Sequence, residues 1–284
     1  MAADDESLTA PHRRLGYEIL PISQKDLATT QTSVPLILPN DFQYDSTSGK
    51  LVKQAGVKRT HLVVVDEALE LLQDITDPVS VLGICGPSRS GKSYVLSRMA
   101  GAHDAFELGN KMNCQTLGIW MGTKVLRNRE KGFTTILIDS EGTDASDAAH
   151  VGILVITVLL TTQLIYNTKN VPKKKDLEEL KALIHVTGKI LAKENEEVAD
   201  DMGEHRRMFP NFMWLLRDVY LKCVHPDTGE EMSATDYVKT VVFRNDSQET
   251  SQERIGRVIS LAFRYVEAFT LPAPGLGEVL IHPV

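Results

Sequence analysis

The sequence has few cysteines, no excess of basic charge and no long apolar run, and each shortage excludes a class of protein. Its three cysteines, Cys85, Cys114 and Cys223, are scattered and show no CxxC spacing. This pattern indicates reduced intracellular thiols rather than a disulfide scaffold or a zinc site. The net charge of −7 argues against a general nucleic-acid binder, which neutralises phosphates with a basic face. We expect no nucleic-acid partner, although a phosphorylated ligand can still occupy a local pocket.

Signals for membrane insertion or export are also missing. The longest apolar stretch, residues 152–166, is interrupted by threonines and is shorter than the ~20 residues that span a bilayer. The first residues are polar and acidic, unlike a secretory signal, and the last four, "IHPV", contain no prenylation cysteine. The histidines show no metal-binding spacing. We therefore expect a cytoplasmic protein without a transmembrane segment.

Apolar runs alternate with helical patterns along most of the chain. Alternation of this kind predicts an α/β fold with a mostly parallel sheet and helices on both faces. Residues 1–33 are polar and lack apolar periodicity, so we expect a flexible tail there and one domain over residues 34–284. The predicted strands are residues 78–85, 133–139, 164–168 and 212–218, and the predicted helices are residues 63–75, 91–101 and 176–201.

The segment "GPSRSGKS", from Gly86 to Ser93, follows an apolar strand and opens a helix. It satisfies the P-loop pattern, in which glycines let backbone amides face phosphate oxygens and the helix dipole adds positive potential. Lys92 is expected to reach the β- and γ-phosphates, and Ser93 to bind Mg²⁺. An ordinary glycine turn is the alternative. The other predicted nucleotide contacts of a P-loop NTPase are Pro87, Ser88, Arg89, Ser90, Gly91 and Tyr94.

Two further segments supply groups that suit the same site. The tetrapeptide "DSEG", Asp139–Gly142, ends a hydrophobic strand, where its carboxylate can bind Mg²⁺ and the glycine amide can face the γ-phosphate. Thr116, in "NCQTLGIW", lies between the two motifs and can bring a hydroxyl to the metal. The predicted metal ligands are therefore Ser93, Thr116 and Asp139.

Recognition of the base departs from the N/T-K-x-D tetrapeptide that most guanine-binding P-loop proteins use. The nearest match, "TKNV" at Thr168–Val171, has valine where the aspartate is needed, so we reject it. A later strand ends in Arg217 and Asp218, and this carboxylate can accept from the N1 and N2 donors of guanine. An ATP-dependent kinase or ATPase is the disfavoured alternative, because N1 of adenine has no proton to donate.

Taken together, these motifs resemble the large GTPase domain of the guanylate-binding protein and atlastin group, which is dynamin-related. The resemblance covers roughly residues 34–225 and is carried by "GPSRSGKSYVLSRMAG", "NCQTLGIWMG", "ILIDSEGTD" and "FPNFMWLLRD". It implies Mg²⁺-dependent hydrolysis of GTP to GDP and phosphate, stimulated when a homodimer forms across the nucleotide-binding faces.

The resemblance also implies roles for individual residues. Arg89 would be an internal arginine finger, and Glu141 would order the water network at the reacting phosphate. Lys92, Ser93 and Thr116 would complete the catalytic set by holding phosphate and Mg²⁺. Asp139 and Gly142 would belong to switch II, and Arg217 and Asp218 would recognise guanine.

Cys114 is a departure from this family. Guanylate-binding proteins tend to carry serine two residues before the switch I threonine, and a thiol is a poorer hydrogen-bonding group than a hydroxyl. A nucleotide-switched protein-binding module with little or no hydrolysis is therefore the alternative function. The sequence shows neither the helical C-terminal region of guanylate-binding proteins nor the membrane segments of atlastins, so the resemblance does not imply membrane remodelling.

Overall fold

The computed structural model describes residues 16–22, 31–106, 116–143, 148–194, 209–243 and 251–273. The chain divides into two compact units, Met1–Thr162 and Gln163–Val284. The division falls inside the region from residue 34 to residue 284 that the sequence analysis assigned to one domain.

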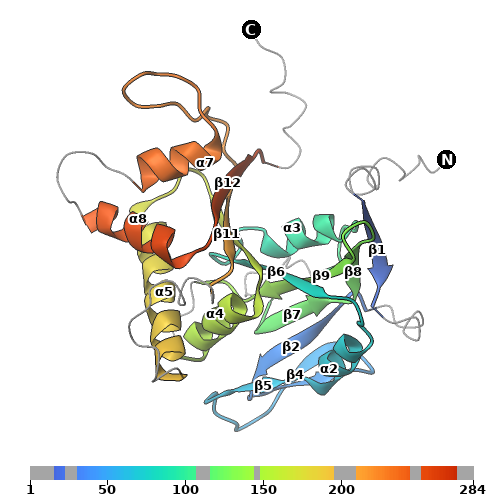
Figure 1. The fold of residues 1–284 in the computed structure, drawn as a ribbon. Coiled ribbons are helices and arrows are strands. Elements are labelled where there is room, and N and C mark those ends of the chain that lie inside the picture. Colours follow the sequence, from blue (N-terminus) through green and yellow to red (C-terminus); the bar gives the residue numbers. More distant parts are fainter. Residues whose placement is uncertain are drawn as a thin grey trace. The chain divides into compact units, whose positions relative to one another are not determined.

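A parallel pair of strands lies at the centre of the first unit (Figure 1). Strands β6 (Val79–Cys85) and β9 (Phe133–Ser140) pair in parallel, with Ile84 opposite Asp139. Both strands are apolar runs, as the sequence predicted, and their carboxyl ends therefore meet at one edge of the sheet. The two loops that follow them, which carry the phosphate-binding and "DSEG" motifs, start from that edge.

Antiparallel strands extend this pair on the other side of β9. Strand β7 (Ile119–Gly122) pairs with β9, β2 (Ser33–Pro39) with β7, and β5 (Leu62–Val64) with β2. The segment between β2 and β5 forms a separate hairpin of two short strands, β3 (Phe42–Asp45) and β4 (Lys50–Lys53).

The expected N-terminal tail contains a strand, which corrects the prediction for residues 17–21. Strand β1 (Tyr17–Pro21) pairs antiparallel with β8 (Lys124–Asn128), and β8 pairs with β9. The ring of Tyr17 lies edge-on to Phe133, with centroids 6.2 Å apart. The local sequence does not indicate this strand, because its partner lies far along the chain.

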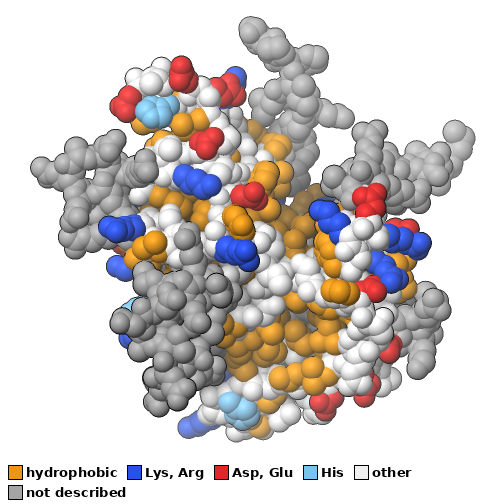
Figure 2. All heavy atoms as spheres, in the orientation of Figure 1, with side chains coloured by type: hydrophobic (Ala, Val, Ile, Leu, Met, Phe, Trp, Pro, Cys, Tyr) orange, Lys and Arg blue, Asp and Glu red, His pale blue; other side chains and the backbone are white. Residues whose placement is uncertain are grey.

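Charged side chains of both signs lie over β1 and β8 on the face shown in Figure 2. Arg129 Nε lies 2.7 Å from Glu18 Oε2, and Arg127 Nη2 lies 2.8 Å from Asp77 Oδ2. Exposed ion pairs of this kind contribute about 0–1 kcal/mol each. The backbone ladder and the apolar contacts are therefore the main attachment of β1.

Helices of the first unit cover both faces of the central strands (Figure 1). Helix α3 (Lys92–Met99) packs on β6 and β9 from one side, and α4 (Ala148–Leu160) packs on them from the other. Helix α2 (Asp66–Gln73), predicted from its apolar spacing, packs on β2. Within the residues that the structure describes, no helix is long and apolar enough to cross a membrane.

The second unit is built on three parallel strands, in the order β10 (Gln163–Lys169), β11 (Asn211–Arg217) and β12 (Val266–Leu271). The long helix α5 (Lys174–Glu194) packs against α8 (Ser251–Ala262). Helix α7 (Ala234–Tyr237) continues directly into a π-helical turn, η3 (Val238–Val242). Buried aromatic rings of Tyr166, Phe212, Trp214 and Phe263 form its core.

The predicted α/β class is confirmed. Parallel strands carry the motif loops in both units, and helices pack on them. The antiparallel strands β7, β2, β5, β8 and β1 are an addition to the first unit.

Candidate functional site

The loop between β6 and α3 has the backbone conformation that its glycines allow. Gly86 has φ 136° and Gly91 has φ 84°, and both values lie in the region that favours glycine. Gly91 is the residue that caps α3, and no side chain accepts a hydrogen bond there. The positive end of the α3 helix dipole therefore lies at this glycine-rich loop, which is the arrangement of a phosphate site.

Lys92 lies across this loop and is only 6% exposed. Its Nζ donates to the carbonyl oxygens of Gly86 and Pro87, each at 3.2 Å. The hydroxyl of Ser90, also buried, donates to the same Pro87 oxygen at 2.8 Å. The ammonium group is therefore held against the backbone of the loop.

Three oxygen-bearing side chains meet beside the loop, from three separate segments. Ser93 Oγ donates to Asp139 Oδ2 at 2.5 Å, and Thr116 Oγ1 donates to the same oxygen at 3.2 Å. The two hydroxyl oxygens are 3.4 Å apart. The set brings together the three predicted metal ligands, and oxygen donors of this kind are the ligands that Mg²⁺ prefers.

Asp139 is the electrostatic centre of this set. It is 1% exposed, and burial raises the pKa of its carboxyl group, whereas Lys92 and the hydrogen bonds from Ser93 and Thr116 oppose that rise. Among the described residues, no group donates a hydrogen bond to its Oδ1 atom. A buried oxygen without a donor is costly, and a cation bound at this position would compensate it.

The loop after β9 lies directly against the phosphate loop. The amide of Thr143 donates to the carbonyl of Gly86 at 3.0 Å. A Cβ atom added at Gly142 would lie 2.6 Å from the amide nitrogen of Ser88, which is closer than real Cβ contacts. Glycine is therefore required at position 142 for the two loops to approach each other.

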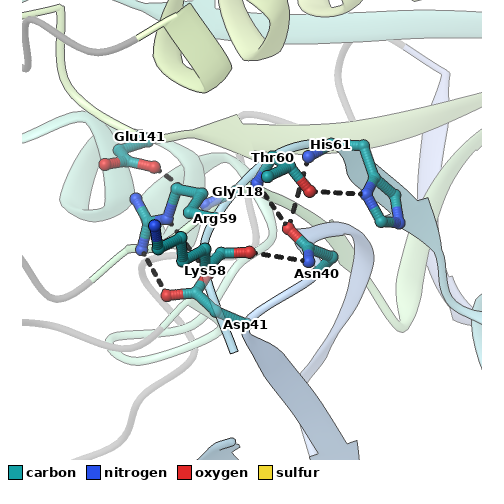
Figure 3. A network of polar contacts seen from close by, with 8 residues as sticks. All are labelled: Asn40, Asp41, Lys58, Arg59, Thr60, His61, Gly118 and Glu141. Carbon is teal, nitrogen blue, oxygen red and sulfur yellow. Dashed lines mark hydrogen bonds and ion pairs between the residues drawn. The ribbon is translucent and has the colours of Figure 1, made fainter. Parts of the chain in front are cut away.

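Glu141 connects this loop to the segment after Thr116. Its Oε2 accepts from the amide of Gly118 at 3.2 Å, and its own amide donates to the Gly118 carbonyl at 2.9 Å. Figure 3 shows this pair beside a polar cluster that includes Asp41 and Arg59. Sequence reasoning missed the cluster, because its members are generic polar residues that no motif marks.

Arg89 lies in the middle of the loop, and Tyr94 lies just after it in α3. Arg89 is exposed and has φ 59°, a left-handed conformation that costs a non-glycine residue roughly 1–2 kcal/mol. Tyr94, in the first turn of α3, is half-buried. The side chain of Arg89 is thus exposed in the middle of the loop.

Arg217 and Asp218 belong to the second unit, at the carboxyl end of β11. Arg217 is 6% exposed, and its carbonyl accepts from the amide of Asn170 at 2.6 Å. Asp218 has φ 60°, and its buried Oδ1 lies 4.0 Å from Arg217 Nη2, with no hydrogen-bond donor among the described residues. Thr168, of the rejected "TKNV" segment, is buried and accepts from Trp214 Nε1 at 2.9 Å.

Two of the three cysteines, Cys85 and Cys223, lie within the described residues. Cys114 lies outside the described residues. Burial raises the pKa of the Cys85 thiol, just before the phosphate loop, to about 12. Cys85 is therefore a neutral packing residue rather than a nucleophile.

The chain is similar to known proteins over most of its length. The family model described as "Guanylate-binding protein, N-terminal domain" matches residues 59–283. Guanylate-binding protein 7 of Homo sapiens is 37% identical over 180 residues, which are 60% of this chain and 28% of that protein. Guanylate-binding protein 2 of Homo sapiens is 33% identical over 184 residues, which are 63% of this chain and 31% of that protein. The chain thus spans about a third of the length of these relatives.

A solved structure of Toc33 from Arabidopsis thaliana is also similar. It superposes with a TM-score of 0.37 and 11% sequence identity, over 74% of this chain and 77% of that one. A similarity of this extent adds nothing to the match with the family model.

Proposed function

Since the chain belongs to the guanylate-binding protein family, we propose that it binds GTP and hydrolyses it to GDP and phosphate in a Mg²⁺-dependent reaction. The observation that carries the proposal is the meeting of Ser93, Thr116 and Asp139 beside the loop that Lys92 spans. Phosphoryl transfer requires a protein to position the phosphates, to hold a divalent cation and to stabilise the negative charge that develops.

In this proposal the phosphate loop holds the nucleotide through its backbone. The amides between Gly86 and Ser93 face the phosphate oxygens, and Lys92 exchanges its two carbonyl partners for the β- and γ-phosphates. Gly86 and Gly91 have the positive φ values that this loop conformation needs, which supports the assignment.

Ser93, Thr116 and Asp139 would hold the metal. Bound Mg²⁺ supplies charge neutralisation at the phosphate oxygens. Asp139 must be ionised to take part, and its burial opposes ionisation. Lys92 and the two hydroxyl donors act in the other direction, which supports a role in which cation and carboxylate bind together.

Base selection is assigned to Asp218, with Arg217 beside it at the end of β11. A carboxylate accepts hydrogen bonds but donates none, so it matches the N1 and N2 donors of guanine. The oxygen of Asp218 that lacks a donor supports this assignment. Competition between labelled GTP and unlabelled ATP tests it: equal displacement by ATP would contradict the assignment.

Arg89 is proposed as the arginine finger, positioned when two copies meet across their nucleotide-binding faces. Its exposure within the phosphate loop supports the proposal. Turnover per molecule should then rise with protein concentration, and Arg89→Ala should lower the stimulated rate by on the order of 10³-fold. Arg129→Ala, which removes an exposed arginine far from the loop, is the matched control. Flat specific activity together with an unchanged Arg89→Ala rate would refute the finger.

The alternative is a nucleotide-switched binding module with negligible hydrolysis, and Cys114 favours it. In that case the γ-phosphate would order the loops after Thr116 and Asp139, and a docked partner rather than phosphate release would be the output. Single-turnover measurements separate the two functions. Tight GTP binding without cleavage over hours would select the switch.

A further inference from the structure

We propose that Arg59 is a positioning residue for Glu141 and that it thereby sets the geometry of the loop that follows β9. The inference rests on the proposed GTP hydrolysis only for its effect on rate. The positioning itself depends on contacts within the chain, and it can be measured without turnover.

Arg59 lies in a short segment that Asn40 fixes on both sides (Figure 3). Asn40 Nδ2 donates to the carbonyl of Lys58 at 3.0 Å, and the amides of Thr60 and His61 donate to Asn40 Oδ1 at 2.8 and 3.3 Å. The amide of Asn40 also donates to the His61 carbonyl at 3.1 Å. These hydrogen bonds therefore hold the backbone around Arg59 independently of the Arg59 side chain.

Asp41 fixes the direction of the Arg59 side chain. The Nε and Nη2 atoms of Arg59 donate to Oδ1 and Oδ2 of Asp41 at 3.0 and 3.5 Å. Asp41 is 4% exposed, and the guanidinium lies 5.8 Å from the ring centroid of Phe42. A planar guanidinium bound through two atoms to a buried carboxylate has little rotational freedom.

The fixed guanidinium faces Glu141. Figure 3 shows it between the carboxylates of Asp41 and Glu141. Glu141 is 5% exposed, and a buried carboxylate needs hydrogen bonds or a positive charge nearby. The amide of Gly118 supplies one hydrogen bond at 3.2 Å, and in Figure 3 the positive guanidinium of Arg59 points toward this carboxylate.

Glu141 is next to residues of the proposed active site, so its position affects theirs. It lies between Asp139 and Gly142, and its partner Gly118 lies two residues after Thr116. Gly118 has φ 76°, and a Cβ atom there would lie 3.3 Å from Leu38 Cα, so the segment is pressed against β2. Strand β2 leads directly to Asn40 and Asp41. The segments next to Thr116 and Asp139, two of the three proposed metal ligands, thus share one support.

The test uses the full chain with Arg59→Ala and Arg59→Lys. In nucleotide-free protein, deuterium exchange at the amides of Gly118 and Glu141 should be faster in Arg59→Ala than in wild type. The kcat for GTP should fall by ~100-fold, as for a small misplacement of reacting groups, while KM stays within about twofold. Arg59→Lys keeps the charge but not the two-atom contact, so it should recover part of kcat.

Arg127→Ala is the matched control, because Arg127 pairs with Asp77 at 2.8 Å on the exposed surface of the same unit. Unchanged exchange and kcat in Arg59→Ala, or equal losses in Arg127→Ala, would overturn the inference. Faster exchange in Arg59→Ala combined with a wild type that never cleaves GTP would support the positioning and refute the proposed hydrolysis. If Arg59→Ala does not fold, the same two measurements on Arg59→Lys decide.

Discussion

The hydroxyl of Ser93, in the first turn of α3, donates a 2.5 Å hydrogen bond to Oδ2 of Asp139, the penultimate residue of β9. The two residues come from motifs separated along the chain, and parallel pairing of β6 with β9 brings them together. This contact marks the proposed metal position.

Asp139 should make the stability of the nucleotide-free protein depend on pH. Burial raises its pKa above the ordinary value of 3.8, so the folded chain binds this proton more tightly than the unfolded chain does. The stability that it contributes is complete below the unfolded pKa and is lost as pH rises through the folded pKa. Asp139→Asn removes this loss, so its melting temperature should gain on that of wild type as pH rises from about 4 to 7. Calorimetry without Mg²⁺ measures the difference, and a constant difference over this range would contradict it.

Lys92→Ala should weaken GTP binding by roughly 10- to 100-fold, because a charge-assisted hydrogen bond contributes about 1.5–3 kcal/mol. Titration with a fluorescent, non-hydrolysable GTP analogue measures the change. Lys124→Ala removes an exposed lysine from β8 and should leave the affinity unchanged. Equal affinities for wild type and Lys92→Ala would exclude a direct contact with phosphate.

Gly142→Ala should separate the two loops. The added methyl group would lie 2.6 Å from the amide nitrogen of Ser88, and overpacking of this kind costs about 1–3 kcal/mol. We expect a lower melting temperature and weaker GTP binding. Gly188→Ala is the control: no atom lies within 4 Å of a Cβ at this position in α5, and it should stabilise the helix by about 0.5–1 kcal/mol. Tolerance of Gly142→Ala would show that the loops do not need this contact.

Asp218→Asn should change the preferred base while preserving the fold. Asparagine tolerates the left-handed backbone conformation found at this position, so the loop should keep its shape. An amide can donate to the second carbonyl oxygen of xanthine, where guanine has its amino group, so affinity should shift from GTP toward XTP. Competition binding with both nucleotides measures the shift. A parallel loss of both affinities would indicate a structural role for Asp218 instead.

The sequence predicted the parts of the fold that rest on local patterns. Strands β6 and β9 are continuous apolar runs, and Gly91 and Lys92 mark the start of α3. Strand β1 was missed because its stability comes from pairing with β8, more than a hundred residues away. The sequence around β1 does not indicate a strand partner so far along the chain.

The candidate site, too, was predicted only where motifs mark its residues. Ser93, Thr116 and Asp139 were selected for their chemistry and motif positions, and the structure places them within hydrogen-bonding distance. The contact between Glu141 and Gly118, and the pair of Asp41 with Arg59, had no sequence signal. These polar residues acquire a specific role only when strand pairing brings their segments together.

Asp139 pairs with Ile84 across the two parallel strands. Because this register decides which face of the sheet Asp139 points to, the motifs alone do not establish that the site forms. Neighbouring side chains in a strand point to opposite faces, so a shift of one residue exchanges the two faces. A related chain with one residue inserted in the middle of β9 would keep every letter of "GPSRSGKS" and "DSEG". Its aspartate would nevertheless turn toward the opposite face of the sheet, away from Ser93. Spacing within β9, measured from its contacts with β6, is therefore as diagnostic of a working site as the motifs themselves.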